Sequence, residues 1–314
     1  MRHLFIIDPI DTFIPKKDTT LALMEAAQRL GSEVWSATLD DLTGRGGYAQ
    51  VRATRHEVDA SAMPFHRVID ETIARLDEFQ VVWMRKDPPF DMQYVYATYL
   101  LDLADPAKTL VMNRPQGLRD ANEKAFILNF PDVITETAIV RTRRDVRETV
   151  EAFGGKAVIK PLGLMGGSGI FVLRTDDGNF NSIVDAVTRA ETEFVMIQRF
   201  LPEASEGDKR IILIDGRPLG AILRVPQGVD FRGNMAAGGI ATKVGITPRE
   251  HEIVERLAPR LRALGLHLVG LDVIGGCVTE INVTSPTGVR EINRFDGVSI
   301  GDDIVGWAEA NAPR

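Results

Sequence analysis

The residues around Lys160 have types and a spacing that suit phosphate binding. Lys160 lies near the end of an apolar run at 157–162, the letters GLMGGSG follow at 163–169, and a second apolar run covers 170–174. Glycines let the backbone approach phosphate oxygens, and a lysine at the end of a buried strand costs free energy unless it meets an anion. The segment predicts either a flap over nucleotide phosphates, as in kinases, or a flexible hairpin with a snorkelling lysine.

Two familiar phosphate motifs do not fit this segment. A P-loop needs a Lys-Ser/Thr pair and a helix directly after its glycines, and neither follows here. The GxGxxG dinucleotide pattern is not matched, and the strand expected at 170–174 stands where that motif requires a helix. A glycine loop between two strands is therefore the expected geometry.

A second group of polar residues lies in two apolar runs, 268–274 and 278–283. Glu280 and Asn282 are two residues apart on a predicted strand, so their side chains share one face. Asp272 in the preceding run adds a second carboxylate. Carboxylate and amide oxygens are ligands that Mg²⁺ prefers, so the group predicts a magnesium site. The alternative is a solvated polar face on an edge hairpin.

Asp272 joins this group only if the two strands pair in one register. A two-residue turn at Gly275-Gly276 pairs Asp272 with Thr279, whereas a three-residue turn that includes the next cysteine pairs it with Glu280. We expect the three-residue turn, which places both carboxylates on one face.

The elements that must position these residues follow from hydrophobic periodicity. The first third predicts strands and helices in alternation, which implies a parallel sheet with helices on its faces. The expected strands are 4–7, 33–38, 81–84 and 110–113, and the expected helices are 19–30, capped by Asp18 and ended by Gly31, and 92–104. Two polar segments, Asp8-Pro9 and 85–89, follow strands at the edge where such sheets bind ligands, and each fits a substrate cradle or an ordinary turn equally well.

The remaining two thirds predict a small mixed module and then a larger one. The expected elements are strands 157–162, 170–174 and 194–200 with helix 181–190, then a hairpin of 209–214 and 219–225, helix 248–264 and the two strands described above. Residues 226–242 lack periodicity and contain four glycines, at 228, 233, 238 and 239. That stretch predicts a functional lid or a surface loop.

The bulk composition excludes several classes of protein. The chain has 314 residues with a formal net charge of -7, which does not favour a nucleic-acid partner. The arginines within 141–147 are interpreted as the start of a solvated helix. Cys277 is the single cysteine, so the chain forms no internal disulfide and no cysteine-rich zinc site. No segment has a signal-peptide pattern or the ~20 apolar residues that span a bilayer, and we expect a cytoplasmic protein without a membrane partner.

Lys124, Lys160 with its glycine loop, and the acidic and amide residues occur in the order found in the ATP-grasp fold. More closely, the chain resembles the bacterial glutathione synthetases from Asp8 nearly to its C-terminus. The matching strings are MRKDPPF (84–90), NRPQGLRDANEK (113–124), KPLGLMGGSGIF (160–171), GDKRI (207–211), RVPQG with RGNMAAGG (224–239), and VGLDVIG with TEINVTSPTG (269–288). Residues 240–245 depart from the family, whose members are richer in arginine there, and 174–182 are unmatched.

The resemblance implies an α/β (α+β mixed) fold in which an N-terminal parallel α/β domain precedes a two-part ATP-grasp fold. The expected domains are 1–120 on the substrate side, 121–202 with the glycine loop, and 203–314 with the lid loop and the metal site. It implies that ATP is bound by Lys124, Lys160, Gly166, Gly167, Ser168, Gly169, Gln198, Arg199, Phe200, Leu201 and Asp208. It implies catalytic roles for Arg210 and Arg224, peptide contacts by Arg85, Asn234, Ser285, Pro286 and Thr287, and metal binding by Asp272, Glu280 and Asn282.

The reaction implied by the resemblance is the ATP-dependent joining of γ-glutamylcysteine and glycine into glutathione through an acyl phosphate. Mg²⁺, with Mn²⁺ as the alternative, is the implied metal, and a homo-oligomer (dimer or tetramer) is the implied assembly. Two rival functions remain: another ligase on the same scaffold, such as a D-alanine–D-alanine or glutamate-adding enzyme, and an ATP-binding regulatory module without catalysis. RKDPPF and SPTG favour the glutathione branch, and the presence of Glu280, Asn282, Arg210 and Arg224 disfavours the regulatory module.

Overall fold

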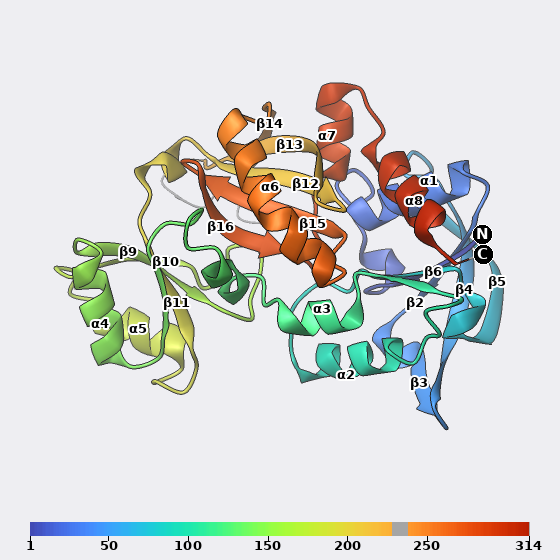
Figure 1. Cartoon of the computed structure of the whole chain (residues 1–314), viewed down its shortest axis with the longest axis horizontal. Helices are drawn as coiled ribbons and strands as arrows, with labels where there is room; N and C mark the ends of the chain where they lie inside the picture. The colour runs from blue at the N-terminus through green and yellow to red at the C-terminus, as the bar shows by residue number, and fades with distance from the viewer. Residues whose placement is uncertain (228–237, 314) are drawn as a thin grey trace.

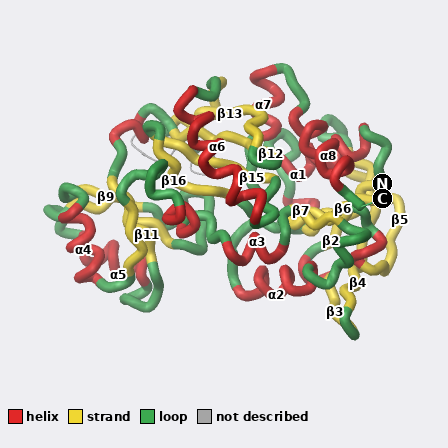
Figure 2. Tube along the Cα trace, viewed as in Figure 1, coloured by secondary structure: helices red, strands yellow, loops and turns green. Residues whose placement is uncertain are grey.

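The computed structural model describes residues 1–227 and 238–313, and its strands form three sheets arranged along the longest axis (Figure 1). Helices and strands are both substantial, and helices cover faces of all three sheets (Figure 2). The mixed α/β class expected from the sequence is therefore confirmed. The predicted lid segment falls largely on residues 228–237, which lie outside the described part of the chain.

The first sheet has seven strands, and its centre is parallel as predicted. The strand order is β3-β4-β2-β1-β6-β7, with β5 paired to β4; the parallel strands are β1 (Arg2–Ile6), β2 (Glu33–Ala37), β6 (Val81–Met84) and β7 (Leu110–Met112). Three antiparallel strands that the sequence analysis did not predict extend this sheet: β3 (Leu42–Arg45), β4 (Tyr48–Val58) and β5 (His66–Arg75). The predicted parallel sheet is therefore confirmed at its centre, and the antiparallel strands extend it beyond β2.

Helices pack on both faces of the first sheet because their apolar sides need a partner. They are α1 (Thr19–Arg29), α2 (Met92–Leu101), α3 (Pro115–Asp120) and the last helix of the chain, α8 (Ile300–Asn311). Asp18 caps α1 as predicted, accepting a hydrogen bond from the Leu21 amide at 2.6 Å. The packing of α8 against α1 places the C-terminal segment beside the N-terminal domain.

The second sheet is antiparallel, with the order β10-β9-β11-β8. Its strands are β8 (Thr137–Val140), β9 (Lys156–Pro161), β10 (Phe171–Arg174) and β11 (Val195–Arg199). Two helices, α4 (Arg143–Ala152) and α5 (Phe180–Thr188), bury apolar side chains against it to form a separate small core. The predicted arginine-rich helix start is confirmed, since α4 begins at Arg143 after its cap Thr142.

The third sheet has the order β14-β13-β12-β15-β16. Its strands are β12 (Asp208–Ile214), β13 (Arg217–Val225), β14 (Ile240–Lys243), β15 (Leu268–Ile274) and β16 (Cys277–Asn282). Helix α6 (Pro248–Ala263) lies across this sheet in Figure 1 and contributes its apolar side to the main core, and α7 (Val289–Asp296) contacts β13 and β14. Among residues 1–227 and 238–313, no helix combines the length and apolar character needed to cross a bilayer.

The turn between β12 and β13 shows how local sequence fixes this sheet. Asp215 and Gly216 both have positive φ, 49° and 69°, as a tight hairpin turn requires, and an Asp-Gly pair tolerates that conformation well. The predicted hairpin is therefore confirmed. It sets β12 and β13 antiparallel, with Asp208 opposite Arg224 at the end near the second sheet.

Candidate functional site

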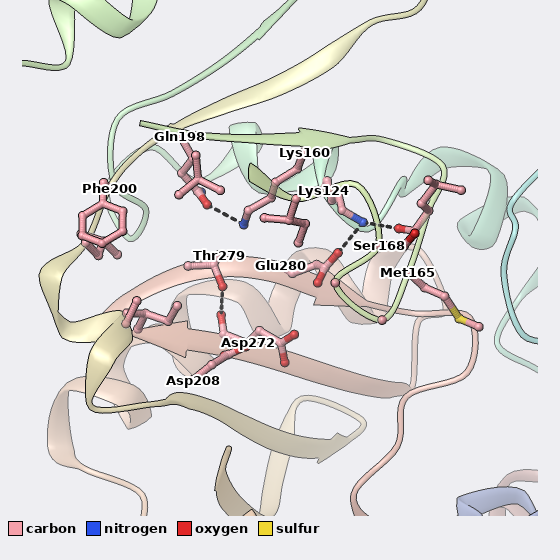
Figure 3. A pocket seen from close by; sticks show the side chains of 18 of the residues that line it. Lys124, Lys160, Met165, Ser168, Gln198, Phe200, Asp208, Asp272, Thr279 and Glu280 are labelled. Carbon is pink, nitrogen blue, oxygen red and sulfur yellow. Dashed lines mark hydrogen bonds and ion pairs between the residues drawn. The ribbon is translucent and has the colours of Figure 1, made fainter. Parts of the chain in front are cut away.

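A pocket lies between the second and third sheets, and Figure 3 views it from close by. We name it the central pocket; it contains about 800 Å³ of space, part of it open to solvent. The structure places these predicted nucleotide-binding residues on its wall: Lys124, Lys160, Gly166, Gly167, Ser168, Gln198, Arg199, Phe200, Leu201 and Asp208. Gly169 is absent from that wall although it belongs to the same loop.

The glycine loop connects β9 to β10, as the sequence predicted, and lies along one side of the central pocket. Gly166, Gly167 and Gly169 have φ values of 64°, 80° and 70°, a region that side-chain-bearing residues rarely adopt. At Gly169, an added Cβ would also come within 2.8 Å of the Pro161 ring. Glycine is therefore required at this position both by its backbone conformation and by the close approach of Pro161.

The two lysines of the central pocket have different partners. Lys124 is 4% exposed, and its ammonium donates to Glu280 Oε1 and to the Leu164 carbonyl, both at 2.7 Å. Burial alone would lower the pKa of Lys124, but Glu280, together with Glu123 and Asp272, outweighs burial and raises it. Lys160 donates instead to the neutral amide oxygen of Gln198 at 2.8 Å, and burial lowers its pKa. Lys160 is thus a cation whose charge calls for an anionic ligand.

One end of the central pocket is apolar. Val158 lines it from the second sheet, Ile170 from the end of the glycine loop just before β10, and Ile274 from the third sheet. Phe200 and Leu201 lie on the segment that joins the two sheets. Apolar side chains on two sides, with the backbone of 199–201 between them, suit a flat aromatic ring. The sequence analysis placed Phe200 and Leu201 here but missed the others, because isolated apolar strand residues give no signal that separates a pocket wall from a core.

The pairing of β15 with β16 places Asp272 opposite Glu280, as predicted, but by a different route. The turn is the two-residue Gly275-Gly276 form, since Ile274 pairs with Cys277. A β-bulge between Asp272 and Val273 then shifts the register by one residue. The expected three-residue turn was therefore wrong, whereas the expected pairing of the two carboxylates is confirmed.

Asp272 also belongs to a buried network of ion pairs with two arginines and a second aspartate. Asp272 accepts from Arg210 through both carboxylate oxygens and lies 2.9 Å from Arg224 Nη2. Arg224 also donates to Asp208 at 2.5 Å. Burial by itself would raise the pKa of Asp272, but the two arginines outweigh it and lower that pKa. At Asp208, burial prevails over Arg224 and raises the pKa to about 7.

The predicted metal ligands offer oxygen atoms of the kind that Mg²⁺ binds. Glu280 uses one oxygen for Lys124, and Asn282 donates its Nδ2 to the Gly270 carbonyl at 3.2 Å, which orients its Oδ1 away from that bond. Asp272 shares both oxygens with arginines, so it enters a metal shell only through its remaining lone pairs. The described residues contain no cluster of three or more His, Cys, Asp or Glu suited to a metal. Two carboxylates and an amide nevertheless fit an ion whose shell is completed by phosphate and water.

Two more pockets continue from the central one. The adjoining pocket shares Met165, Gly166 and Glu280 with it, and the predicted catalytic residues Arg210 and Arg224 line the adjoining pocket. Asn282, Ser285 and Thr287 also line it. The distal pocket in turn shares Asp87, Ser285 and Thr287 with the adjoining pocket, and Arg85 lines its wall.

Of the remaining predicted peptide contacts, one is indirect and one is not described. Pro286 offers its carbonyl to Arg85, while Asn234 lies outside the described residues. Glu123 was missed by the sequence analysis, although it lines the adjoining pocket and precedes Lys124 directly. Its Oε1 accepts from the Val283 and Thr284 amides, each at 2.9 Å, and from the Thr284 hydroxyl at 2.8 Å. Its position beside a predicted ligand was the only sequence signal that could have indicated it.

The structure resembles solved ATP-grasp enzymes in fold. The match to the crystal structure of D-cycloserine synthetase DcsG has a TM-score of 0.69 at 15% identity and covers 99% of this chain and 100% of that one. The match to the ATP-grasp ligase PsnB complexed with a minimal precursor has a TM-score of 0.64 at 16% identity and covers 99% of each chain. These similarities show the ATP-grasp architecture.

Sequence comparison assigns the family. Residues 1–119 match the model of the prokaryotic glutathione synthetase N-terminal domain, and residues 123–297 match that of the prokaryotic glutathione synthetase ATP-grasp domain. The glutathione synthetase of Synechocystis sp. is 48% identical, with 98% of this chain and 99% of that protein covered. The glutathione synthetase of Gloeobacter violaceus is 47% identical, with 98% and 96% covered. The chain belongs to the family of prokaryotic glutathione synthetases.

Proposed function

We propose that this protein joins γ-glutamylcysteine to glycine at the expense of ATP, forming glutathione with release of ADP and phosphate. The observation that carries the proposal is the junction of the central and adjoining pockets, where the glycine loop and Glu280 line both pockets and Arg210 and Arg224 line the adjoining one. Membership of the prokaryotic glutathione synthetase family supports the same reaction.

The proposed reaction begins in the central pocket. The apolar end takes the adenine ring, and Lys124, Lys160 and the glycine loop hold the phosphates. The cysteinyl carboxylate of γ-glutamylcysteine enters the adjoining pocket and attacks the terminal phosphorus. The bond from that phosphorus to the oxygen of ADP breaks, which leaves an acyl phosphate.

The second step takes place at the same junction. The neutral amine of glycine attacks the acyl carbon and gives up one proton to water, the bond from that carbon to the phosphate oxygen breaks, and inorganic phosphate leaves. Arg210 and Arg224 neutralise negative charge on the transferred phosphoryl group in both steps. Their orientation is fixed by Asp272 and Asp208, so little reorganisation accompanies the reaction.

We propose Mg²⁺, with Mn²⁺ as the alternative, as the metal, held by Asp272, Glu280 and Asn282 together with ATP phosphates. The ion supplies positive charge to the phosphates. The register of β15 and β16, which brings both carboxylates to one face, supports this set.

We further propose the division into domains 1–120, 121–202 and 203–314, because each of the three sheets falls within one of these ranges. A homo-oligomer, dimeric or tetrameric, is proposed on exposed apolar side chains of the edge strand β5, namely Val68, Ile69 and Ile73. The single cysteine supports a reducing cytoplasm as the location. Light scattering of the purified protein tests the assembly.

The decisive experiment measures ADP release against a panel of acyl and amine substrates. We expect release that requires γ-glutamylcysteine and glycine together. Turnover with D-alanine alone, or with glutamate as the amine, would instead place the protein with another ligase of this scaffold. ATP binding with no ADP release under any pairing would favour a regulatory module.

A further inference from the structure

Side chains from three neighbouring strands of the second sheet meet at Gln198. In the register of the sheet, Gln198 of β11 lies directly opposite Thr137 of β8 and opposite Val158 of β9. Lys160 is two residues beyond Val158, so its side chain emerges on the same face and lies diagonal to Gln198. The sheet therefore brings a threonine, a glutamine and a lysine together in a row that ends at the central pocket.

Hydrogen bonds join these three side chains in one direction. The Thr137 hydroxyl donates to the Thr135 carbonyl at 2.9 Å and accepts from Gln198 Nε2 at 3.1 Å. With its nitrogen engaged in this way, the Gln198 amide turns Oε1 toward Lys160, whose ammonium donates to it at 2.8 Å (Figure 3). Gln198 is 3% exposed, so water does not freely replace a hydrogen bond that its amide loses. The buried amide therefore depends on Thr137 for its orientation.

This direction leaves the Lys160 ammonium able to bind an anion. A lysine ammonium has three N–H donors, and among the described residues the structure gives that of Lys160 one acceptor, the neutral Oε1 of Gln198. A reversed amide would turn its own donors toward the ammonium and push it from this position. Lys124 differs, because its ammonium is paired with the Glu280 carboxylate. The charge of Lys160 is thus held in place without being neutralised.

We propose that Thr137 is a positioning residue for ATP: its hydroxyl fixes the amide of Gln198, and that amide aims the Lys160 ammonium at a phosphate of the nucleotide. Thr137 itself does not line the central pocket, so it acts through Gln198. The inference rests on the proposed function for the identity of the nucleotide, and adds a residue of β8 to the groups that bind it. The alternative is that the hydroxyl serves only the stability of β8, an edge strand of the second sheet.

Calorimetric titration of the full chain with MgATP, without dipeptide or glycine, tests the inference independently of turnover. Thr137→Val keeps the shape of the side chain and removes the hydroxyl, and the loss of a neutral hydrogen bond corresponds to a rise of about fivefold in the Kd for ATP. Thr137→Ser restores the hydroxyl and should stay within about twofold of wild type. Thr137→Ala should repeat the loss, so the result does not depend on the folding of one variant. An unchanged Kd in Thr137→Val or Thr137→Ala would overturn the inference.

A double-mutant cycle with Lys160→Met separates positioning from a purely structural role. If Thr137 acts through Lys160, Thr137→Val should raise the Kd for ATP by less than about twofold once Lys160 is replaced. A rise of about fivefold in both backgrounds would show that Thr137 only supports the fold, and would refute the inference.

The matched control is Thr149→Val, which removes a hydroxyl that donates to the Asp145 carbonyl within α4 at 2.6 Å, outside the central pocket. Its Kd for ATP should equal that of wild type. A rise as large as that in Thr137→Val would mean that any hydroxyl lost from this part of the protein weakens binding, and would also count against the inference.

Steady-state kinetics separate this inference from the proposed function. With γ-glutamylcysteine and glycine, Thr137→Val should raise the KM for ATP about fivefold and leave the KM values for the dipeptide and for glycine within about twofold. Absence of turnover by the wild-type protein would contradict the proposed function, while the titrations with MgATP would still decide the role of Thr137. A raised KM for the dipeptide with an unchanged Kd for ATP would assign Thr137 to the other substrate and refute the inference.

Discussion

Replacing either lysine of the central pocket with methionine should weaken ATP binding, but only the replacement of Lys124 should also lower the stability of the fold. Both lysines are expected to contact ATP phosphates, yet Lys124 is paired with Glu280 at 2.7 Å while Lys160 donates to the neutral Gln198. Methionine keeps most of the side-chain volume and removes the charge. Both substitutions therefore remove a proposed contact to an ATP phosphate, but each removes a different hydrogen bond within the protein.

The magnitudes follow from those partners. A charged contact to phosphate is worth about 2 kcal/mol, which corresponds to a rise of about 30-fold in the Kd for ATP in either variant. Without ATP, Lys124→Met leaves Glu280 without its partner and should lower the free energy of unfolding by about 3 kcal/mol. Lys160→Met removes a cation whose pKa is lowered by burial, so its unfolding free energy should stay within about 1 kcal/mol of wild type.

Calorimetric titration with ATP in the absence of dipeptide gives the Kd, and urea unfolding of the ligand-free protein gives the stability. An ATP affinity unchanged in Lys160→Met would refute the role assigned to that lysine. A loss of about 3 kcal/mol in Lys160→Met, equal to that in Lys124→Met, would show that the two charges are compensated alike and refute the reasoning from their partners.

Three further predictions concern the wall of the central pocket and the glycine loop beside it. Burial raises the pKa of Asp208 from 3.8 to about 7, so the protonated carboxyl contributes stability at low pH that is lost as the pH rises. In urea unfolding, Asp208→Asn should therefore gain stability relative to wild type as the pH goes from 4 to 7. A stability difference that stays constant over that range would contradict this. Asp272 has a lowered pKa, so its contribution is present above about pH 4 and lost in acid; Asp272→Asn should cost about 3 kcal/mol at pH 7 and little in acid, measured in the same way. In Gly169→Ala the new Cβ strains a positive φ and meets Pro161, so the KM for ATP should rise about tenfold. In the control Gly163→Ala the new Cβ would meet no described atom within 4 Å, so the KM for ATP should stay within about twofold of wild type.

The sequence was sufficient to predict an element where a local pattern of residues determines its structure. Asp18 caps α1 because its side chain replaces a missing backbone acceptor, and the Asp215-Gly216 pair adopts positive φ values that a tight turn requires. The apolar runs of β1, β2 and β6 are buried on both faces apart from the first residue of β1 and of β2, and such continuous runs indicate parallel strands. These features depend on a few neighbouring residues.

The features that the sequence did not reveal depend on tertiary contacts. Strand β5 exposes most of its side chains, so it shows no apolar face that alternation could detect. The bulge beside Asp272 pairs it with Glu280 although the turn has only two residues. The residue types around Asp272 do not indicate a bulge. Glu123 is placed at the pocket by tertiary contacts, because its carboxylate accepts hydrogen bonds from the backbone amides of residues 283 and 284.

Transfer of an oxygen atom tests the central claim most directly. γ-Glutamylcysteine labelled with oxygen-18 in its cysteinyl carboxylate is incubated with ATP, glycine and the enzyme, and the released phosphate is analysed by mass spectrometry. An acyl phosphate formed at the junction of the central and adjoining pockets carries one carboxylate oxygen into phosphate, so we predict one labelled oxygen for each glutathione formed. Unlabelled phosphate accompanying glutathione would contradict the account.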